Sequence, residues 1–312
     1  MAPSHCPVKD DPNTVWPPFC PNIGAAYFYA ILFAITLILH ITQAIVHRKA
    51  YSWVISMSAL WQLLAYAFRI ASINSPTKQG LYIGYFVLIL LAPLWANAYT
   101  YMVLGRMVYN FTNNATVLGV KAWRFTLIFV VLDIVAFIVQ LAGATSASGD
   151  IPDSQIMRGL HIYMTGIGIQ QIFIIAFFAL TIKFHQQMKA DLPLTFRRRP
   201  LILLYVVYAV LGLITIRIIF RLIEYSQGYK SSIVYHEGYQ YVFDSTVMLI
   251  ALVLFNVVHP GRIMPGKHSE LPSRKERKAA GKEYQWGRAR EQQGDAPLSY
   301  ESSTQLESQM KE

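Results

Sequence analysis

The order of hydrophobic and polar residues divides the chain into seven long apolar runs separated by polar segments. Each run is continuous over about 20 residues, which is the length that an α-helix needs to cross roughly 30 Å of hydrocarbon. Strands of a membrane barrel would instead alternate apolar and polar residues over segments of about ten. The sequence therefore predicts seven membrane-spanning helices, at about residues 24–46, 53–72, 81–104, 123–143, 160–183, 201–223 and 239–258.

The composition strengthens this prediction. Of the 312 residues, 54 % are hydrophobic and 14 % are charged, whereas a soluble domain has about 45–50 % apolar and about 25 % charged residues. We therefore expect an all-α integral membrane bundle. Residues 1–23 would form an N-terminal arm, residues 24–261 the membrane domain, and residues 262–312, which lose apolar periodicity, a disordered basic tail.

The distribution of lysine and arginine predicts the orientation in the membrane. One set of loops and the tail are rich in basic residues, whereas the other set contains only Lys9, Lys78, Arg158 and Lys230. This asymmetry predicts an extracellular N-terminus and a cytoplasmic C-terminus. The basic residues that produce the net charge of +10 are thus explained by membrane orientation, so we expect no nucleic-acid partner. The sequons that begin at Asn110 and Asn114 then lie in a cytoplasmic loop, where glycosylation does not occur.

The two cysteines, Cys6 and Cys20, both precede the first apolar run. On the extracellular side they lie in an oxidising compartment, and we expect a disulfide between them. Closure of a loop of about fifteen residues would stabilise the folded arm by roughly 3 kcal/mol. Two free thiols on an unstructured arm are the alternative.

Ionisable residues in the last two apolar runs carry the strongest functional signal. Arg217, Arg221 and Glu224 are spaced i, i+4, i+7 and therefore lie on one face of the sixth helix. Glu237 and Asp244 are also seven residues apart, where the seventh helix begins. A short loop makes these two helices antiparallel neighbours, so the two charged faces should meet in the outer half of the membrane.

Two interpretations of these charges remain open, and both can hold at once. Unpaired charges would cost about 2.5–3.5 kcal/mol each within the membrane, so ion pairs that fix helix packing are one interpretation. The other is an outer polar pocket for an amphipathic ligand, in which a carboxylate meets an ammonium or an arginine meets a phosphate. Arg69, near the outer end of the second helix, is a further candidate member of the cluster.

Three polar residues lie deeper in the predicted bundle. Asp133 is the one acidic residue of the fourth helix, and Gln140 lies two turns further out on the same face. An isolated carboxylate of this kind either binds a proton or cation in a transporter, or is protonated and hydrogen-bonded. Asn97 lies one turn after Pro93, where a helix usually bends, and either lines a cavity or ties two helices together. We treat Asp133, Gln140 and Asn97 as candidates for a proton or polar relay.

No set of residues indicates catalysis or a bound cofactor. His40, His161, His236 and His259 are scattered without the i, i+4 spacing of a helical metal site. The two cysteines cannot complete a zinc site by themselves, and the seventh helix has no lysine that could bind retinal. We therefore expect neither an enzyme nor a cofactor.

Several separated motifs lie in the membrane domain. Near its end the sequence reads IRIIFRLIEYSQG, HEGYQYVFD and ALVLFNVVHPG, and earlier helices contain LLAPLWANAYTYMVLGR, LDIVAFIVQLAG and GIGIQQIFIIAFFALTIKFHQQM. In this order they resemble the signature of the fungal lipid-translocating exporter family, also described as RTA-like proteins. The resemblance covers about residues 22–262. It implies a seven-helix protein that exports or flips sphingoid long-chain bases, or handles lipophilic compounds such as toxic sterols, azoles and porphyrins.

The function that we expect is therefore translocation or export of amphipathic lipids, with resistance to lipophilic toxins. Membrane lipids or lipophilic small molecules would be its partners, and the plasma membrane or an endomembrane its location. The alternative is a seven-helix receptor or membrane-stress sensor without transport activity, whose cytoplasmic loop with Arg197, Arg198 and Arg199 could contact a partner.

Overall fold

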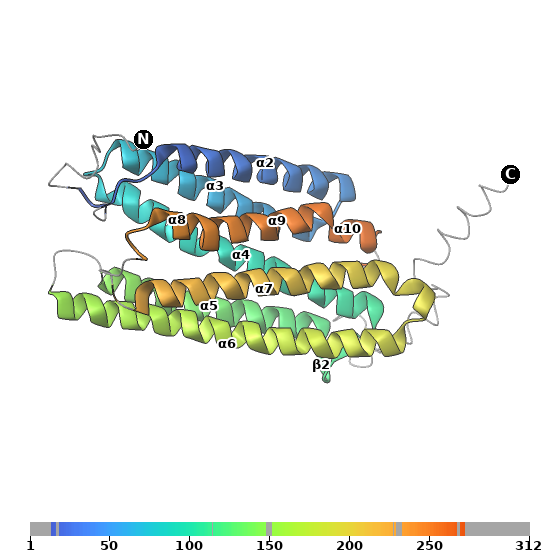
Figure 1. Cartoon of the computed structure of the whole chain (residues 1–312). Coiled ribbons are helices and arrows are strands. Elements are labelled where there is room, and N and C mark those ends of the chain that lie inside the picture. Colours follow the sequence, from blue (N-terminus) through green and yellow to red (C-terminus); the bar gives the residue numbers. More distant parts are fainter. Residues whose placement is uncertain are drawn as a thin grey trace.

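The computed structural model describes residues 14–16, 19–113, 115–147, 152–226, 228, 233–266 and 269–271. In this part of the chain, seven helical segments are long and apolar enough to span a membrane. They run side by side along one direction (Figure 1), and the predicted all-α bundle of seven membrane-spanning helices is confirmed. We name the two ends of the bundle after the ends of its first helix, the Asn22 end and the His47 end.

The first six spans are single helices: α2 (Ile23–His47), α3 (Trp53–Asn74), α4 (Gln79–Phe111), α5 (Ala122–Ser146), α6 (Asp153–Asp191) and α7 (Arg198–Ser226). The seventh span is composite and consists of α8 (Glu237–Gln240), the π-helical segment η3 (Tyr241–Thr246) and α9 (Val247–Val257), followed by α10 (Pro260–Ile263). Single 3₁₀ turns precede α3 and α7, namely η1 (Ala50–Ser52) and η2 (Leu194–Phe196).

Two helices, α4 and α6, extend beyond their apolar runs. The apolar run at 81–104 lies within α4, which ends at Phe111. The run at 160–183 lies within α6, which begins seven residues before the run and ends eight residues after it. Hydropathy marks the residues that suit hydrocarbon, and a helix whose next turns are polar continues into the headgroup region and water. Leu192 is extended, with φ −101° and ψ 137°, because a residue that precedes a proline avoids the helical conformation.

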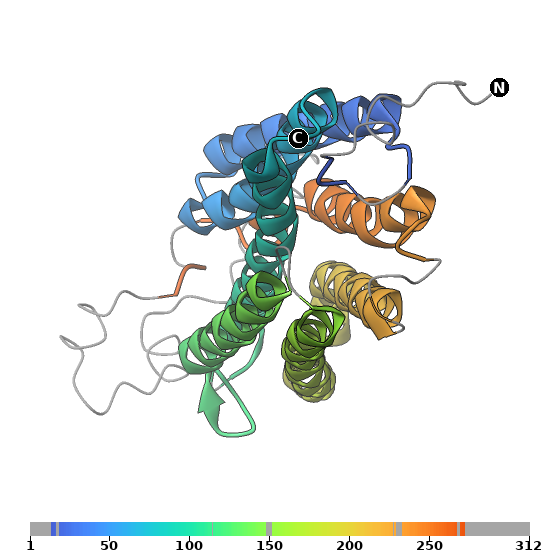
Figure 2. The ribbon, with the colours of Figure 1, turned by 90° about the vertical axis from the view of Figure 1, so that its left-hand side faces the viewer.

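Helix α4 occupies a central position in the bundle. It packs against α3 and α5 and also contacts α6, α7 and α9. Figure 2 shows α4 crossing from the side of α2 and α3 to the side of α5 and α6. Helix α7 lies between α6 and the seventh span. The interior side chains of α4 therefore meet residues from most of the other helices.

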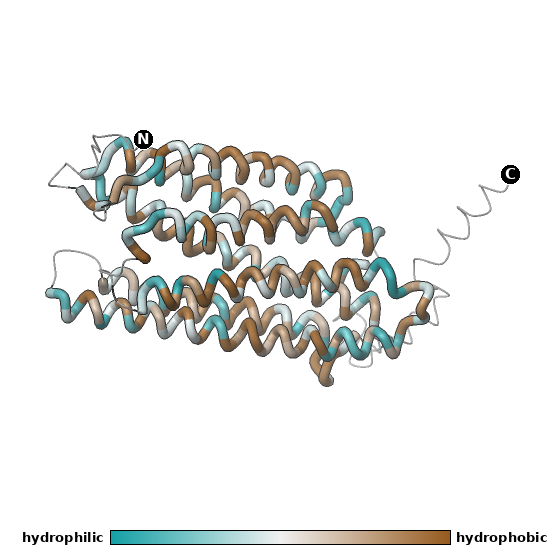
Figure 3. Tube along the Cα trace, in the orientation of Figure 1, coloured by the Kyte–Doolittle hydropathy of each residue, from teal (hydrophilic) through white to brown (hydrophobic). Residues whose placement is uncertain are grey.

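The outer surface of the bundle is apolar. Hydrophobic stretches predominate along the middle of the helices, and hydrophilic stretches are commoner toward both ends (Figure 3). Large apolar side chains such as Ile35, Val135 and Ile175 are 50–58 % exposed. In water such a surface would drive association, whereas in a bilayer lipid acyl chains cover it.

Glycines bring α5 and α6 into close contact. A Cβ atom on Gly143 would lie 2.3 Å from the backbone nitrogen of Tyr163, and a Cβ atom on Gly166 would lie 2.8 Å from the backbone nitrogen of Gln140. Any larger residue at these positions would push the helices apart. Small residues of this kind are typical of helix interfaces in membranes. Because these glycines have no side chains, the two helices approach closely enough for Gln140 to reach α6.

A two-stranded hairpin connects α4 and α5. Strand β1 (Thr116–Val117) pairs antiparallel with β2 (Val120–Lys121). The turn residues Leu118 and Gly119 both have positive φ, at 51° and 75°, which is the pattern of a type I′ turn. The sequence pattern does not predict this hairpin, because two-residue strands leave no alternation to detect.

The described residues after the seventh span pack against the His47 end. Lys49 Nζ donates to the carbonyl oxygen of Gly266 at 2.6 Å and to Ser269 Oγ at 2.7 Å, and Met264 is 2 % exposed. The sequence predicts a disordered tail from residue 262, but α10 and these contacts extend the packed domain further. Hydropathy misses this segment because hydrogen bonds to Lys49 help to hold it. Burial lowers the pKa of Lys49.

Candidate functional site

The six ionisable residues that the sequence predicts for an outer polar pocket lie together near the Asn22 end of the bundle. We call them the charge cluster; they come from α3, α7, α8 and η3 and are Arg69, Arg217, Arg221, Glu224, Glu237 and Asp244. Three arginines face three carboxylates, so their formal charges cancel. The side chain of Glu237, 10 % exposed, is the most accessible of the six.

Asp244 is the centre of the inner part of the cluster. Its side chain is fully buried, and its Oδ1 accepts from Arg217 Nε at 2.5 Å. Its Oδ2 accepts from Arg221 Nη2, while Arg221 Nη1 donates to Glu224 Oε2 at 3.0 Å. Removing one partner from such a buried pair leaves an uncompensated charge, which is strongly destabilising. These ion pairs therefore fix α7 against the seventh span.

The π-helical segment η3 separates the partners of the two carboxylates on the seventh span. The sequence spacing predicts Glu237 and Asp244 on one stripe of an α-helix, facing the charges of α7. In the structure Asp244 lies in η3, where the wider turn changes the direction of the side chains. Asp244 bonds to α7, whereas Glu237 bonds to α3. The two carboxylates, which the sequence places together against α7, thus belong to two separate groups of ion pairs.

Glu237 and Arg69 form the outer part of the charge cluster. Arg69 Nη2 donates to Glu237 Oε1 at 2.5 Å, and the other carboxylate oxygen accepts from the backbone nitrogen of Asn22 at 2.7 Å. Arg69 Nη1 also donates to Gln240 Oε1 at 3.4 Å. Glu237 therefore connects the second span to the start of the first.

Three aromatic rings surround the Arg69 guanidinium and form what we call the aromatic cage. Its members come from the N-terminal segment, α4 and η3: Trp16, Tyr85 and Tyr241. The guanidinium carbon lies 4.7–5.3 Å from their ring centroids, within range for cation–π attraction. Trp16 Nε1 donates to Ser72 Oγ at 3.1 Å, which fixes that ring. The sequence does not single out these rings, because no spacing rule connects side chains on separate segments.

Asp133 lies near the middle of α5 and is 2 % exposed. Its Oδ2 accepts from Tyr101 Oη at 2.8 Å and from Asn97 Nδ2 at 3.0 Å, both on α4. The structure thus joins Asp133 to Asn97, two residues that the sequence singles out separately. Tyr101 was missed, although its i, i+4 spacing from Asn97 places it on the same face of α4.

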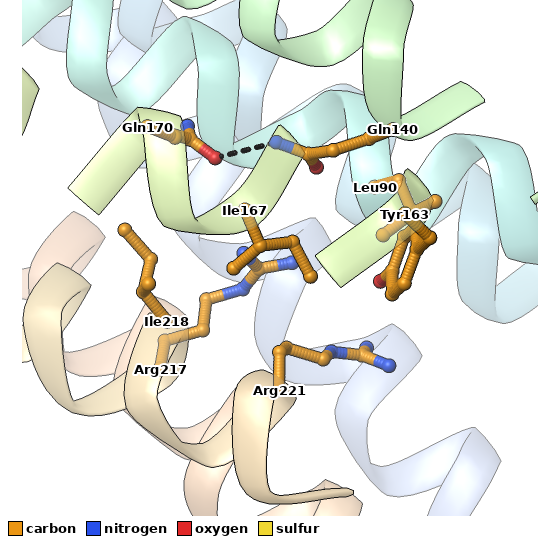
Figure 4. Close-up of a pocket in the computed structure, with 8 residues that line it drawn as sticks. All are labelled: Leu90, Gln140, Tyr163, Ile167, Gln170, Arg217, Ile218 and Arg221. Atoms are coloured by element: carbon orange, nitrogen blue, oxygen red, sulfur yellow. Dashed lines mark hydrogen bonds between the residues drawn. The ribbon is translucent and has the colours of Figure 1, made fainter. Parts of the chain in front are cut away.

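Gln140 belongs to a different group from Asp133. Its Nε2 donates to Gln170 Oε1 at 3.0 Å, and both side chains lie on the wall of a small cavity (Figure 4). Arg217 and Arg221 line the opposite side of that cavity. It has room for about one water molecule. The predicted relay residues therefore form two groups, one around Asp133 and one between α5 and α6.

The cysteine prediction lies partly outside the described residues. Cys6 is not among them, so a disulfide between Cys6 and Cys20 stays a prediction. In the described ranges, no group of three or more His, Cys, Asp or Glu side chains is arranged to hold a metal ion.

Comparisons with known proteins agree on one family. A family model described as "RTA1 like protein" matches residues 55–267. The chain is 38 % identical over 304 residues to the "Probable lipid transporter atnI" of Emericella nidulans, across 88 % of this chain and 78 % of that protein. No solved structure matches the chain.

Two further relatives are more distant. The chain is 29 % identical to the "Lipid-translocating exporter-like protein RTA1" of Leptosphaeria maculans, across 80 % of this chain and 51 % of that protein. It is 20 % identical to the "Sphingoid long-chain base transporter RSB1" of Saccharomyces cerevisiae, across 83 % and 77 % of the two chains. The region matched by the family model includes the whole charge cluster and Asp133, but not Trp16.

Proposed function

Since the chain belongs to the RTA1-like family, we propose that it translocates or exports amphipathic lipids with a cationic amino headgroup, such as sphingoid long-chain bases. Resistance to lipophilic toxins that are also amphipathic would follow from the same activity. The names of two relatives, a probable lipid transporter and a sphingoid long-chain base transporter, support this substrate class. The proposal includes no catalytic step.

The outer part of the charge cluster is the observation that carries this proposal. Glu237 and the aromatic cage already surround a cation, the Arg69 guanidinium. An ammonium headgroup has the same requirements, N–H donors for a carboxylate and positive charge for the faces of aromatic rings. The headgroup would replace Arg69 at Glu237, while its alkyl chain stays against the apolar surface of the bundle.

The inner part of the cluster has a different role in this proposal. Asp244 is fully buried and shared between Arg217 and Arg221. A ligand would have to separate two ion pairs to reach it, which is costly in an apolar interior. The packing role therefore falls to Arg217, Arg221, Glu224 and Asp244, and contact with the ligand falls to Glu237, from which the headgroup would displace Arg69.

The test uses the purified full-length protein in liposomes with a fluorescent sphingoid base. Glu237→Gln keeps the size of the side chain but removes its charge, and its translocation rate should fall at least about tenfold, equivalent to a loss of roughly 1.4 kcal/mol. Glu237→Asp keeps the carboxylate and should retain part of the rate. Asp153→Asn, a matched neutralisation at the exposed start of α6, should leave the rate unchanged.

Two results would contradict the proposal. A Glu237→Gln protein that translocates the base as fast as the wild type would exclude Glu237 from headgroup recognition. A wild-type protein that binds the labelled base saturably but does not move it would instead favour the receptor or membrane-stress sensor.

The proposed location is the plasma membrane, with the N-terminus outside and an endomembrane as the alternative. The basic loops and tail on the opposite side support this orientation. In that orientation the Asn22 end, and with it Glu237, faces the outer leaflet. Labelling of an N-terminal epitope tag on intact cells, compared with permeabilised cells, measures this directly.

A further inference from the structure

Asp133 has no positively charged partner in the described residues, although it is nearly fully buried in the middle of an apolar bundle. Its hydrogen-bond donors are Tyr101 and Asn97, which are both neutral. An ionised carboxylate in such surroundings is costly unless it is paired. Asp133 therefore differs from Asp244, which has two arginines, and its position is suited to a carboxyl group that accepts a proton.

The oxygens around Asp133 leave a place for that proton. Asp133 Oδ2 accepts both hydrogen bonds, whereas Asp133 Oδ1 and Asn97 Oδ1 are buried and have no partner in the described part of the chain. When Asp133 is ionised, the Asn97 amide donates to it as observed. When Asp133 is protonated, the same amide turned about its last torsion presents Oδ1 as an acceptor. The same residues can therefore satisfy both protonation states.

No other charged group acts directly on Asp133 in the described residues. From α4, the titratable side chain that faces it is Tyr101. From α6, Phe177 packs against the Tyr101 ring with centroids 4.4 Å apart. Among the described residues, no ionisable side chain of α6 or α7 forms a hydrogen bond or ion pair with Asp133. Its protonation is therefore governed by its solvation and by the two neutral hydrogen-bond donors.

A polar route leads toward Asp133 from the Asn22 end. It begins at the charge cluster and continues through the water-sized cavity to the Gln140–Gln170 pair. The Tyr163 hydroxyl and Arg221 Nε, which belong to residues lining that cavity, have no partner among the described residues, so a water molecule there would satisfy them. Gln140 lies two turns, about 10 Å, from Asp133 along α5.

The opposite side of Asp133 is closed. Toward the His47 end, the Tyr101 ring packs against Phe129, with centroids 5.6 Å apart, as well as against Phe177. Phe129 and Phe177 themselves contact edge to face at 5.0 Å. Polar side chains therefore extend from the Asn22 end to within two helical turns of Asp133, and an aromatic layer lies on its other side.

We infer that Asp133 is a proton-binding site that takes up a proton from the Asn22 end and releases it again during the translocation cycle. The step is the equilibrium between a carboxylate with a proton and the carboxylic acid, and no other bond changes. The inference rests on the proposed function for its role in a cycle, but the site itself does not.

Infrared spectroscopy of the full-length protein in liposomes tests the site without any transported substrate. The wild type should show the C=O stretch of a buried carboxylic acid, which shifts in D₂O and disappears at alkaline pH. Asp133→Asn should lose this band, whereas Glu224→Gln and the exposed control Asp153→Asn should retain it. A wild-type protein without such a band at any pH, or an Asp133→Asn protein that retains it, would overturn the inference.

Translocation under a pH gradient tests the role in the cycle. A difference of one pH unit changes the ratio of protonated to ionised carboxyl groups about tenfold. With the more acidic side at the Asn22 end, such a gradient should change the wild-type translocation rate severalfold. Asp133→Glu keeps a carboxyl group and should retain this dependence, whereas Asp133→Asn should lose it. A wild-type rate that is insensitive to the gradient would overturn the coupling. Absence of translocation together with the titrating carboxyl band would instead contradict the proposed function and leave the site established.

Discussion

Two buried carboxylates in the same apolar bundle have opposite surroundings. Asp244, near the Asn22 end, accepts hydrogen bonds from two arginines, and its group of charges is balanced. Asp133, near the middle, accepts hydrogen bonds from a tyrosine and an asparagine. Both are at most 2 % exposed. We infer from this difference that the partners of a carboxylate, rather than its burial, decide whether it fixes helices together or exchanges a proton.

The largest effect is expected from Asp244→Asn. This change leaves Arg217 and Arg221 buried without their shared carboxylate, and we expect a loss of about 3–5 kcal/mol in the free energy of unfolding. Thermal unfolding of the purified protein in detergent measures it. Asp153→Asn is the matched control at the exposed start of α6, and its effect should stay within about 1 kcal/mol, the range for a carboxylate in the first turn of a helix. An Asp244→Asn protein of wild-type stability would show that these ion pairs do not hold α7.

A smaller effect is expected at the outer part of the charge cluster. Arg69→Gln removes both an ion pair and the cation inside the aromatic cage, whereas Glu237→Gln removes the ion pair alone. In a double-mutant cycle the two changes should be non-additive, with a coupling energy of about 1–3 kcal/mol. Unfolding of the two single variants and the double variant gives this energy. Strictly additive effects would mean that Arg69 and Glu237 do not act as a pair.

A still smaller effect is expected from Asp133→Asn, although the chemical change is the same as at Asp244. The new amide oxygen accepts from Tyr101 and Asn97, and no buried positive charge loses its partner. We therefore expect a loss of less than about 1 kcal/mol, within the range of one neutral hydrogen bond. If this variant is destabilised as strongly as Asp244→Asn, the distinction between the two carboxylates fails.

The last expected effect is no change at all. Asn110 donates to the carbonyl oxygens of Arg106 and Ser269 at 2.8 Å and 2.9 Å, and in the proposed orientation it faces the cytoplasm. Glycosidase treatment of the protein from its native membrane should therefore leave its mass unchanged. A glycan at Asn110 or Asn114 would reverse the orientation and place the charge cluster at the inner leaflet instead.

The helices were predictable because a membrane span requires a long uninterrupted apolar run, and each of the seven helices contains one. Their polar extensions were not, since no hydrophobic requirement marks them. The ordered segment around Ser269 was missed for a related reason, because it is held by Lys49 through hydrogen bonds that leave no periodic pattern.

The members of the charge cluster were predictable, but their pairing was not. Spacing within one helix indicates which charges share a face, as for Arg217 and Arg221. Together with the short loop it places Asp244 opposite α7, but it does not indicate that a π-helical segment separates the two carboxylates, so that Glu237 bonds to Arg69 instead. The aromatic cage depends on three segments that are separate in the sequence, so only the folded chain reveals it.

The balance of three positive and three negative charges has an electrical consequence. Moving one elementary charge across a membrane potential of 100 mV involves about 2.3 kcal/mol of work. The charge cluster has no net charge, so a membrane voltage does no net work on it when it moves as one rigid unit. A cationic headgroup bound at Glu237 adds one full charge to that unit. Voltage would then act on the loaded charge cluster and not on the empty one.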